Sequence, residues 1–278
     1  MGQVGDGTGN LVARGGFTEV VGNHRWKVVH GTRDHSCGVT EEGEAYCWGY
    51  SVNGKLGNDT IPAPAIVTFP VPVVGGHTFE TLGVGFWFTC ALTPAGEAWC
   101  WGIHDGIYLG VGTALTDRAS AVPVKVAGGH SFVSLTVGSR HACGVTASGE
   151  AYCWGENRGA LGDGTWDNRG TPTRVVGDHK WYRLYAGSVF TCGLTTRYAV
   201  YCWGDSRGGP VVPNSPDVYV TPQLIFPAPG PYRDLAAGGD HVCGIRWSGM
   251  GECWGEGEWG ELGNGKRENS PIPVPIVR

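Results

Sequence analysis

Short apolar segments separated by glycine-rich turns run along the whole chain. The clearest set lies mid-chain, where residues 132–137, 142–146, 150–154 and 173–176 are each rich in β-branched, aromatic or other apolar side chains. Segments of this length with turn residues between them are typical of β-strands. The set therefore predicts four short antiparallel strands, with a long glycine loop between the third and the fourth.

The same set recurs along the chain, and ten cysteines mark its period. Each recurrence contains two cysteines with nine residues between them, and the second cysteine always precedes Trp-Gly. The first cysteines of successive pairs are 53, 53, 49 and 51 residues apart. A period of roughly 50 residues in a chain rich in glycine and aromatics is typical of propeller blades, each of which is one four-stranded sheet. The pairs are Cys37 and Cys47, Cys90 and Cys100, Cys143 and Cys153, Cys192 and Cys202, and Cys243 and Cys253.

Composition and charge narrow the class of protein. The 49 Gly and 17 Pro approach the proportion found in disordered chains, but 12 Trp, 10 Tyr and 8 Phe supply the apolar surface that such chains lack. A net charge of −5 gives no basic footprint for nucleic acid, and no run of about 18 apolar residues could insert into a membrane. The N-terminal residues also lack the basic and apolar regions of a secretion signal. Either a signal was removed or truncated, which is our expectation, or the protein never had one.

Two segments resemble the repeat of the regulator of chromosome condensation 1 (RCC1) family, namely HACGVTASGEAYCWGENRGALGDGT (141–165) and HSCGVTEEGEAYCWG (35–49). The resemblance implies an all-β fold in which residues 1–278 form a single β-propeller domain. Its repeats are 1–49, 50–102, 103–155, 156–204 and 205–255, with a partial repeat at 256–278. Three places depart from the family pattern: Tyr198 replaces a hairpin glycine, Thr32 replaces a glycine after a first strand, and residues 208–212 interrupt a glycine loop.

Five complete blades and one extra N-terminal outer strand are expected. Residues 271–277 supply the last fourth strand, and Phe17–Val21 read as a fourth strand without the three that should precede it. Two interpretations stay open: the chain is a truncated part of a longer protein, or it is a five-bladed ring with an additional edge strand. An unpaired strand attracts other chains, so self-assembly by strand addition is a further expectation.

The cysteine register predicts disulfides within the blades. Each pair is symmetric about the hairpin turn, so its two residues face each other on neighbouring strands, at the Cβ separation a disulfide needs. Reduced core cysteines are the alternative, and the Cys-x2–4-Cys knuckles of zinc sites are absent. Five disulfides would place the protein in an oxidising compartment, such as the bacterial exterior or periplasm.

Catalytic chemistry is not expected. Seven of the nine histidines recur in register with the blades, which indicates a structural role: His24, His77, His130 and His179 before the first strand, and His35, His141 and His241 two residues before a cysteine. Only His30 and His104 fall outside the register. We therefore predict no enzyme activity, no catalytic residue, no metal site and no cofactor.

Candidate binding residues lie where the repeats differ. The loops after the first and third strands of each blade share one face of the propeller, the loop face. The hairpins between the second and third strands share the other, the turn face, with the turns that enter the first strands. The turn face looks uniform, whereas the loop face varies at two positions of every repeat. The residues at the position three before each first cysteine are Asp34, Trp87, Arg140, Val189 and Asp240. The residues directly after each Trp-Gly are Tyr50, Ile103, Glu156, Asp205 and Glu256.

Variation on a fixed scaffold suggests a binding surface, and Trp and Arg are typical of binding hot spots. Neutral drift on exposed loops is the alternative. We predict an extracellular or surface-exposed propeller that binds a protein or glycan, or that builds an extracellular structure. The alternatives are an intracellular regulator of the guanine-nucleotide-exchange type, as in the RCC1 family's namesake, and an enzyme-inhibitor propeller, as in a bacterial β-lactamase inhibitor. No loop matches either of these residue by residue.

Overall fold

The computed structural model describes residues 2–8, 18–60, 66–205 and 217–277, and these form five four-stranded antiparallel sheets. The predicted all-β fold with five complete blades is confirmed.

The first blade holds β1 (Trp26–Gly31), β2 (His35–Thr40), β3 (Ala45–Tyr50) and β4 (Ile66–Pro72), and the second β5 (Thr81–Val84), β6 (Phe88–Leu92), β7 (Ala98–Ile103) and β8 (Ala119–Lys125). The third holds β9 (Phe132–Val137), β10 (His141–Thr146), β11 (Ala151–Gly155) and β12 (Arg169–Arg174), and the fourth β13 (Trp181–Ala186), β14 (Phe190–Thr195), β15 (Val200–Asp205) and β16 (Val218–Phe226). The fifth holds β17 (Tyr232–Ala237), β18 (His241–Arg246), β19 (Gly251–Gly255) and β20 (Ser270–Pro275). Two 3-10 turns, η1 (Val52–Gly54) and η2 (Gly112–Ala114), lie in the glycine loops of the first two blades.

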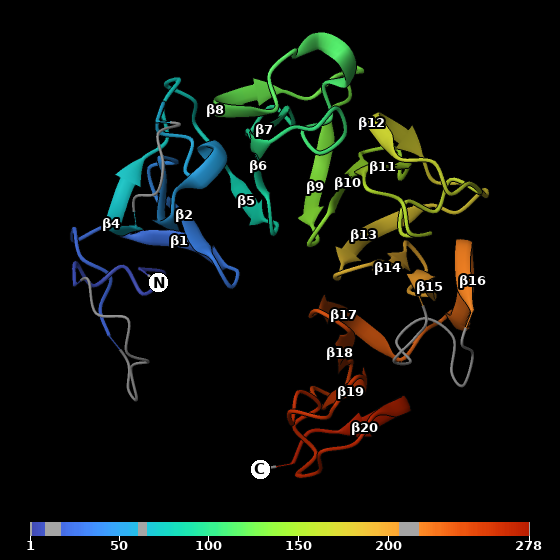
Figure 1. The fold of residues 1–278 in the computed structure, drawn as a ribbon. Coiled ribbons are helices and arrows are strands. Elements are labelled where there is room, and N and C mark those ends of the chain that lie inside the picture. The colour runs from blue at the N-terminus through green and yellow to red at the C-terminus, as the bar shows by residue number, and fades with distance from the viewer. Residues whose placement is uncertain (1, 9–17, 61–65, 206–216, 278) are drawn as a thin grey trace.

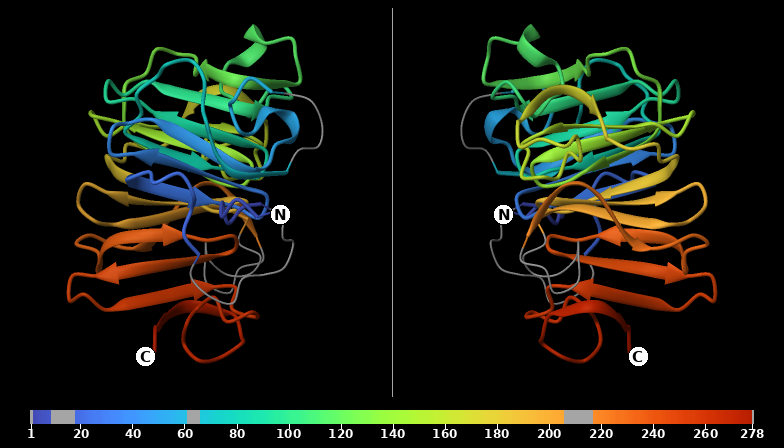
Figure 2. Two further views of the ribbon diagram at one scale, coloured as in Figure 1. Left: turned by 90° about the vertical axis from the view of Figure 1, so that its left-hand side faces the viewer. Right: turned by 90° about the vertical axis from the view of Figure 1, so that its right-hand side faces the viewer.

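The blades stand side by side in an open arc, with the first and last blades at its two ends (Figure 1). The first strand of each blade lies on the inside of the arc and the fourth on the outside. The five inner strands line a central channel of about 530 Å³. In the edge-on views of Figure 2 the hairpins project on one side of the arc and the glycine loops on the other, as the predicted turn face and loop face require.

The fourth strand begins earlier than the sequence pattern predicts. In the third blade it starts at Arg169 rather than at residue 173, because a bulge at Trp154 lets Gly155 pair with Arg169. Gly155 has a φ of 117°, and a Cβ there would lie 2.5 Å from the carbonyl oxygen of Arg140. Only glycine fits such a close approach in this conformation. The Trp-Gly pair therefore brings the end of each third strand against the loop that precedes the second strand.

A tryptophan from each of several blades anchors that blade to the glycine loop of the blade before it. The indole N–H of Trp101 donates to the carbonyl of Lys55 at 3.0 Å, and that of Trp203 donates to the carbonyl of Ala160 at 2.8 Å. The tryptophans of all five Trp-Gly pairs are at most 1% exposed. The repeat boundaries assigned from the sequence follow each Trp-Gly at the end of a third strand, so they fall within blades rather than between them. Each of the four repeats between residues 50 and 255 joins the glycine loop and fourth strand of one blade to the first three strands of the next.

Side-chain pairs of two kinds alternate along the junctions between blades. His35 and Thr89 share a hydrogen bond of 2.9 Å between the first and second blades, and His141 and Thr191 share one of 2.8 Å between the third and fourth. All four side chains are almost completely buried. At the other two junctions the corresponding pairs are apolar and lie within continuous cores: Phe88 with Ala142, and Phe190 with Val242.

The structure assigns no strand to residues 18–21, which corrects the predicted extra outer strand; Phe17 and residues 208–212 lie outside the described residues. The Val21 N–H donates to the carbonyl of Gly5 at 2.9 Å, the same bond that Val176 makes to Gly162 after β12. The segment thus holds the place of the end of a fourth strand. A strand needs a hydrogen-bonded neighbour, and within the described residues no third strand stands beside this one.

Residues 2–8 take the place of a preceding glycine loop on the first blade. The carbonyl of Gln3 accepts the indole N–H of Trp48 at 2.7 Å and the hydroxyl of Ser36 at 3.1 Å. This repeats the anchoring of Trp101 and Trp203. Within the described part of the chain no helix is long and apolar enough to cross a membrane.

Candidate binding face

The ten candidate residues meet in five pairs on the loop face. In every blade the residue after Trp-Gly donates its backbone N–H to the carbonyl of the residue three before the first cysteine, at 2.9 to 3.0 Å. The two variable positions of each repeat are therefore a single place in the structure. The donor–acceptor pairs are Tyr50–Asp34, Ile103–Trp87, Glu156–Arg140, Asp205–Val189 and Glu256–Asp240.

These positions are less exposed than the sequence suggested. Asp205 is buried and the other nine residues are half-buried, because they stand at the ends of strands rather than at the tips of loops. The most exposed aromatics of this face lie farther out in the glycine loops, where Trp166 is 59% and Trp259 is 82% exposed. The sequence comparison considered only the residues next to each Trp-Gly and before each first cysteine, so it did not identify either tryptophan as a candidate binding residue. The signal that could have found them is a tryptophan within a glycine loop, outside the Cys-Trp-Gly motif of the repeats.

Between the first two blades the face is aromatic, and a buried lysine lies between its rings. The Lys55 ammonium lies 5.1 Å from the ring centre of Tyr50 and 5.8 Å from that of Trp87, and 3.3 Å from a carboxylate oxygen of Asp34. Only 1% of the Lys55 side chain is exposed, so burial lowers its pKa, and the Asp34 carboxylate opposes that shift. Lys55 fastens two candidate pairs to each other, and the rings of Tyr50 and Trp87 are half-buried.

At the third blade, hydrogen bonds to a single carboxylate hold the side chains of the face together. Glu156 accepts hydrogen bonds from Arg140 at 2.8 Å, Arg158 at 2.9 Å and the Tyr108 hydroxyl at 3.1 Å. Burial opposes ionisation of Glu156, but the bonds from the two arginines outweigh it and lower the pKa of Glu156. Burial and the charge of Glu156 raise the pKa of Tyr108 to about 12. Two guanidinium groups share one carboxylate, so this sector keeps a positive surface.

At the last two blades the face is acidic. Burial and the nearby charge of Asp205 raise the pKa of Asp240, and burial together with Asp240, Glu261 and Glu258 raises the pKa of Glu256. These carboxylates repel one another, so a basic partner side chain would be stabilised here. No cluster of three or more His, Cys, Asp or Glu side chains among the described residues has the arrangement of a metal site.

The five predicted disulfides are present, and no described cysteine is free. Each joins directly opposed residues of the second and third strands, with Cα atoms 4.0 to 4.1 Å apart. The bonded partners are those expected from the cysteine register: Cys37 with Cys47, Cys90 with Cys100, Cys143 with Cys153, Cys192 with Cys202, and Cys243 with Cys253.

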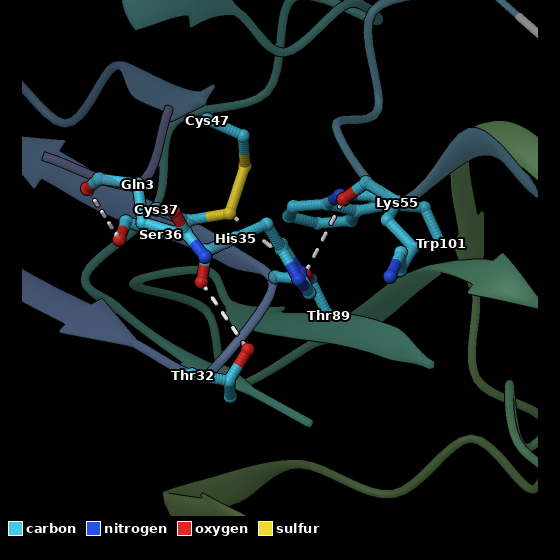
Figure 3. The surroundings of a disulfide bond; sticks show 9 residues. All are labelled: Gln3, Thr32, His35, Ser36, Cys37, Cys47, Lys55, Thr89 and Trp101. Atoms are coloured by element: carbon cyan, nitrogen blue, oxygen red, sulfur yellow. Dashed lines mark hydrogen bonds between the residues drawn. A yellow bond between two sulfur atoms is a disulfide. The ribbon is translucent and has the colours of Figure 1, made fainter. Parts of the chain in front are cut away.

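The bridges hold the strands that carry the candidate pairs. Figure 3 shows that the bridge between Cys37 and Cys47 lies against the first junction, with His35 and Thr89 on one side. Gln3 and Ser36 lie on its other side. The disulfide therefore sits between the contact that joins the first two blades and the contact that anchors the N-terminal residues.

The recurring histidines also make contacts within the blades. The four that precede the first strands each lie against an aromatic ring of the third strand, with ring centres 3.9 to 4.2 Å apart. These pairs are His24–Tyr46, His77–Trp99, His130–Tyr152 and His179–Tyr201. One face of each of these rings is covered, and all four histidines belong to the turn face, so none contributes to the candidate binding face.

The family model of the regulator of chromosome condensation (RCC1) repeat matches residues 31–55 and 132–159. The chain is an RCC1-repeat β-propeller. The crystal structure of yeast RCC1 (Prp20) bound to Kap60 covers 92% of this chain with a TM-score of 0.76 at 21% identity, and that of human WBSCR16 covers 90% with a TM-score of 0.77 at 18% identity. The chain covers 62% and 66% of those two chains.

Among curated relatives, the ultraviolet-B receptor UVR8 of Arabidopsis thaliana is 32% identical over 148 residues. That match takes in 50% of this RCC1-repeat propeller and 33% of the receptor. The human E3 ubiquitin-protein ligase HERC2 is 29% identical over 142 residues, which are 3% of its length. The propeller thus spans a third or less of the relatives it matches, so what these whole proteins do is not established for it.

Two tryptophans of this propeller should respond differently to truncation. Trp154→Ala is expected to cost about 3–5 kcal/mol, because the ring is fully buried in the core that joins the second and third blades. Trp87→Ala should cost roughly 1–2 kcal/mol, since its half-buried ring packs on that core only in part and covers Lys55. Urea unfolding monitored by circular dichroism checks both values. Equal losses in the two variants would show that Trp87 is a core residue and would remove it from the binding face.

Proposed function

We propose that this propeller is a non-enzymatic binding protein that recognises a protein, or a glycan, through its loop face. One observation carries the proposal: five hydrogen-bonded pairs, fixed by the same backbone contacts, present different chemistry in every blade. The face changes from aromatic at Tyr50 and Trp87, through the Arg140–Glu156 sector, to acidic at Asp240 and Glu256. Such a gradient suits a partner of mixed charge held in one orientation.

The chemistry of the face favours binding over catalysis. The described titratable groups with the most strongly lowered pKa values, His35 and His141, are buried between blades with a threonine partner, where no substrate could reach them. The exposed Trp166 and Trp259 are of a residue type enriched at binding hot spots. The protein RCC1, in the structure with Kap60, is a propeller of this fold seen in complex with a protein.

Five disulfides support an oxidising compartment, and we place the protein outside the cytosol, at an extracellular or cell-surface location. An intracellular exchange-type regulator would keep its cysteines reduced, so the redox state separates the two functions. A bacterial source, an inhibitory role towards an enzyme and self-assembly through residues 17–21 all stay predictions. Deleting residues 1–22 and measuring the mass in solution tests the last of them.

The loop face is tested by capture from the surface fraction of the producing organism on immobilised protein. Arg140→Ala should reduce the captured amount of the main partner by about tenfold, because the residue type is one whose loss at a hot spot costs more than 1 kcal/mol. Arg140 is also half-exposed, so its loss should leave the melting temperature nearly unchanged. The matched control is Glu42→Ala, an exposed residue of the turn face. Loss of capture in Glu42→Ala together with full capture by Arg140→Ala would place the site on the other face.

A further inference from the structure

One hairpin of the turn face has a tyrosine at the positive-φ position where the other hairpins have glycine. Four hairpins turn at a glycine of positive φ, whereas the fourth blade uses Tyr198 with a φ of 61°. The left-handed region is unfavourable for a tyrosine, and strained residues of this kind gather at functional sites. Glycine would make the same turn without strain, so the tyrosine side chain must serve another purpose. The hairpin glycines are Gly43, Gly96, Gly149 and Gly249.

The Tyr198 side chain completes a row of three exposed or half-exposed rings across two blades. Its ring centre lies 5.9 Å from that of Tyr182 and 4.8 Å, edge-on, from that of Trp247. Tyr182 is 51% and Trp247 58% exposed, and Met250 at the same hairpin is exposed as well. An apolar patch of this kind on a charged surface marks an interaction site.

A groove of about 580 Å³ continues the row towards the third blade. Its lining includes the exposed Val133, the Tyr182 ring and the cations Lys180 and Arg183, and it includes no carboxylate. Lys180 and the exposed Arg197 form no ion pair within the described part of the chain, and the Arg183 guanidinium lies 3.9 Å from Asp234. In a chain with a net charge of −5, this sector of the turn face is locally basic.

We propose that the turn face of the third to fifth blades docks an acidic segment of a protein that carries an apolar anchor. The Tyr182–Tyr198–Trp247 row and the groove receive the apolar side chain, and Lys180 and Arg197 contact the flanking carboxylates. Aromatic and arginine side chains are the types enriched at protein interfaces, and the charge of this sector complements an acidic partner. The surface is separate from the loop face, so its test does not depend on the function proposed above.

The decisive variant is Tyr198→Gly, which restores the glycine of the other hairpins. Binding of a fluorescein-labelled, glutamate-rich peptide with a single Phe is followed by fluorescence anisotropy, together with the melting temperature of each variant. Tyr198→Gly should weaken binding about tenfold while leaving the melting temperature unchanged or higher. Lys180→Glu should weaken binding by a similar factor and flatten its salt dependence. The matched control is Trp166→Ala, which removes an equally exposed tryptophan from the loop face and should bind the peptide as the parent protein does.

Three results would overturn the proposal. The first is a peptide affinity that Tyr198→Gly and Lys180→Glu leave unchanged. The second is a lowered melting temperature with unchanged binding in Tyr198→Gly, which would make the tyrosine a structural residue. The third is binding of an oligogalacturonate in place of the peptide, which would show that the surface takes anionic glycans.

Discussion

Reduction of the five disulfides should unfold the protein at room temperature without denaturant. Each bridge closes a loop between cysteines ten residues apart, which the chain-entropy model values at roughly 2–3 kcal/mol. Their combined contribution is of the order of the whole stability of a typical domain, about 5–15 kcal/mol. The effect is expected to be cooperative, because the bridges lie beside the buried tryptophan and histidine pairs that join neighbouring blades.

Far-ultraviolet circular dichroism during titration with a phosphine reductant measures this loss. Alkylation of the untreated protein followed by intact-mass analysis provides the control, and it should show two hydrogens fewer per bridge and no labelled thiol. Native protein with several alkylated cysteines, or a reduced protein that keeps its melting temperature, would contradict the expectation. Either result would also remove the main support for an extracellular location.

Acid should destabilise the protein well before its carboxylates are protonated. Burial, together with the charge of Lys55, lowers the pKa of His35 to about 3, and burial lowers that of His141 to about 4, from 6.5 in the unfolded chain. Between pH 6.5 and about 4 the unfolded state binds these protons and the folded state does not, so stability falls as the pH falls through this window. The contribution of His141 alone amounts to about 3 kcal/mol, fully present above pH 6.5. Urea unfolding at a series of pH values measures it.

The alternating junctions supply the matched variant. His141→Phe combined with Thr191→Val copies the apolar pairs Phe88–Ala142 and Phe190–Val242, so it should fold and lose part of the acid sensitivity. His35 and the other histidines whose pKa is lowered by burial keep their share. Thr191→Val alone should cost about 1–3 kcal/mol at pH 7, because it leaves the buried imidazole nitrogen of His141 without a partner. A double variant as acid-sensitive as the parent would assign the pH dependence to other groups.

The sequence determined the structure of each blade, because a blade is formed by consecutive segments of the chain. Its four strands are consecutive, four of the five hairpins turn at glycine, and its cysteines are symmetric about the turn. Short apolar segments between turn residues, together with the cysteine spacing, therefore predicted both the sheets and the disulfides. The prediction of an extra strand at residues 17–21 was wrong for the opposite reason. A short apolar segment beside turn residues can form a strand, but a strand also needs a hydrogen-bonded neighbour, and the segment itself does not show whether one is present.

The loop positions were identified from the sequence, and their pairing follows from the same symmetry about the hairpin as that of the cysteines. Asp34 lies beside Tyr50, and Arg140 beside Glu156, because both pairs continue the unbroken register of the second and third strands. Exposure was decided by the tertiary structure: Asp205 is buried, while Trp166 and Trp259 face solvent. The row of Tyr182, Tyr198 and Trp247 was likewise invisible, since its members come from a strand and two hairpins of neighbouring blades. Contacts within a repeat are fixed by residues close in sequence, whereas contacts between blades depend on how whole sheets pack, and only the folded chain brings those residues together.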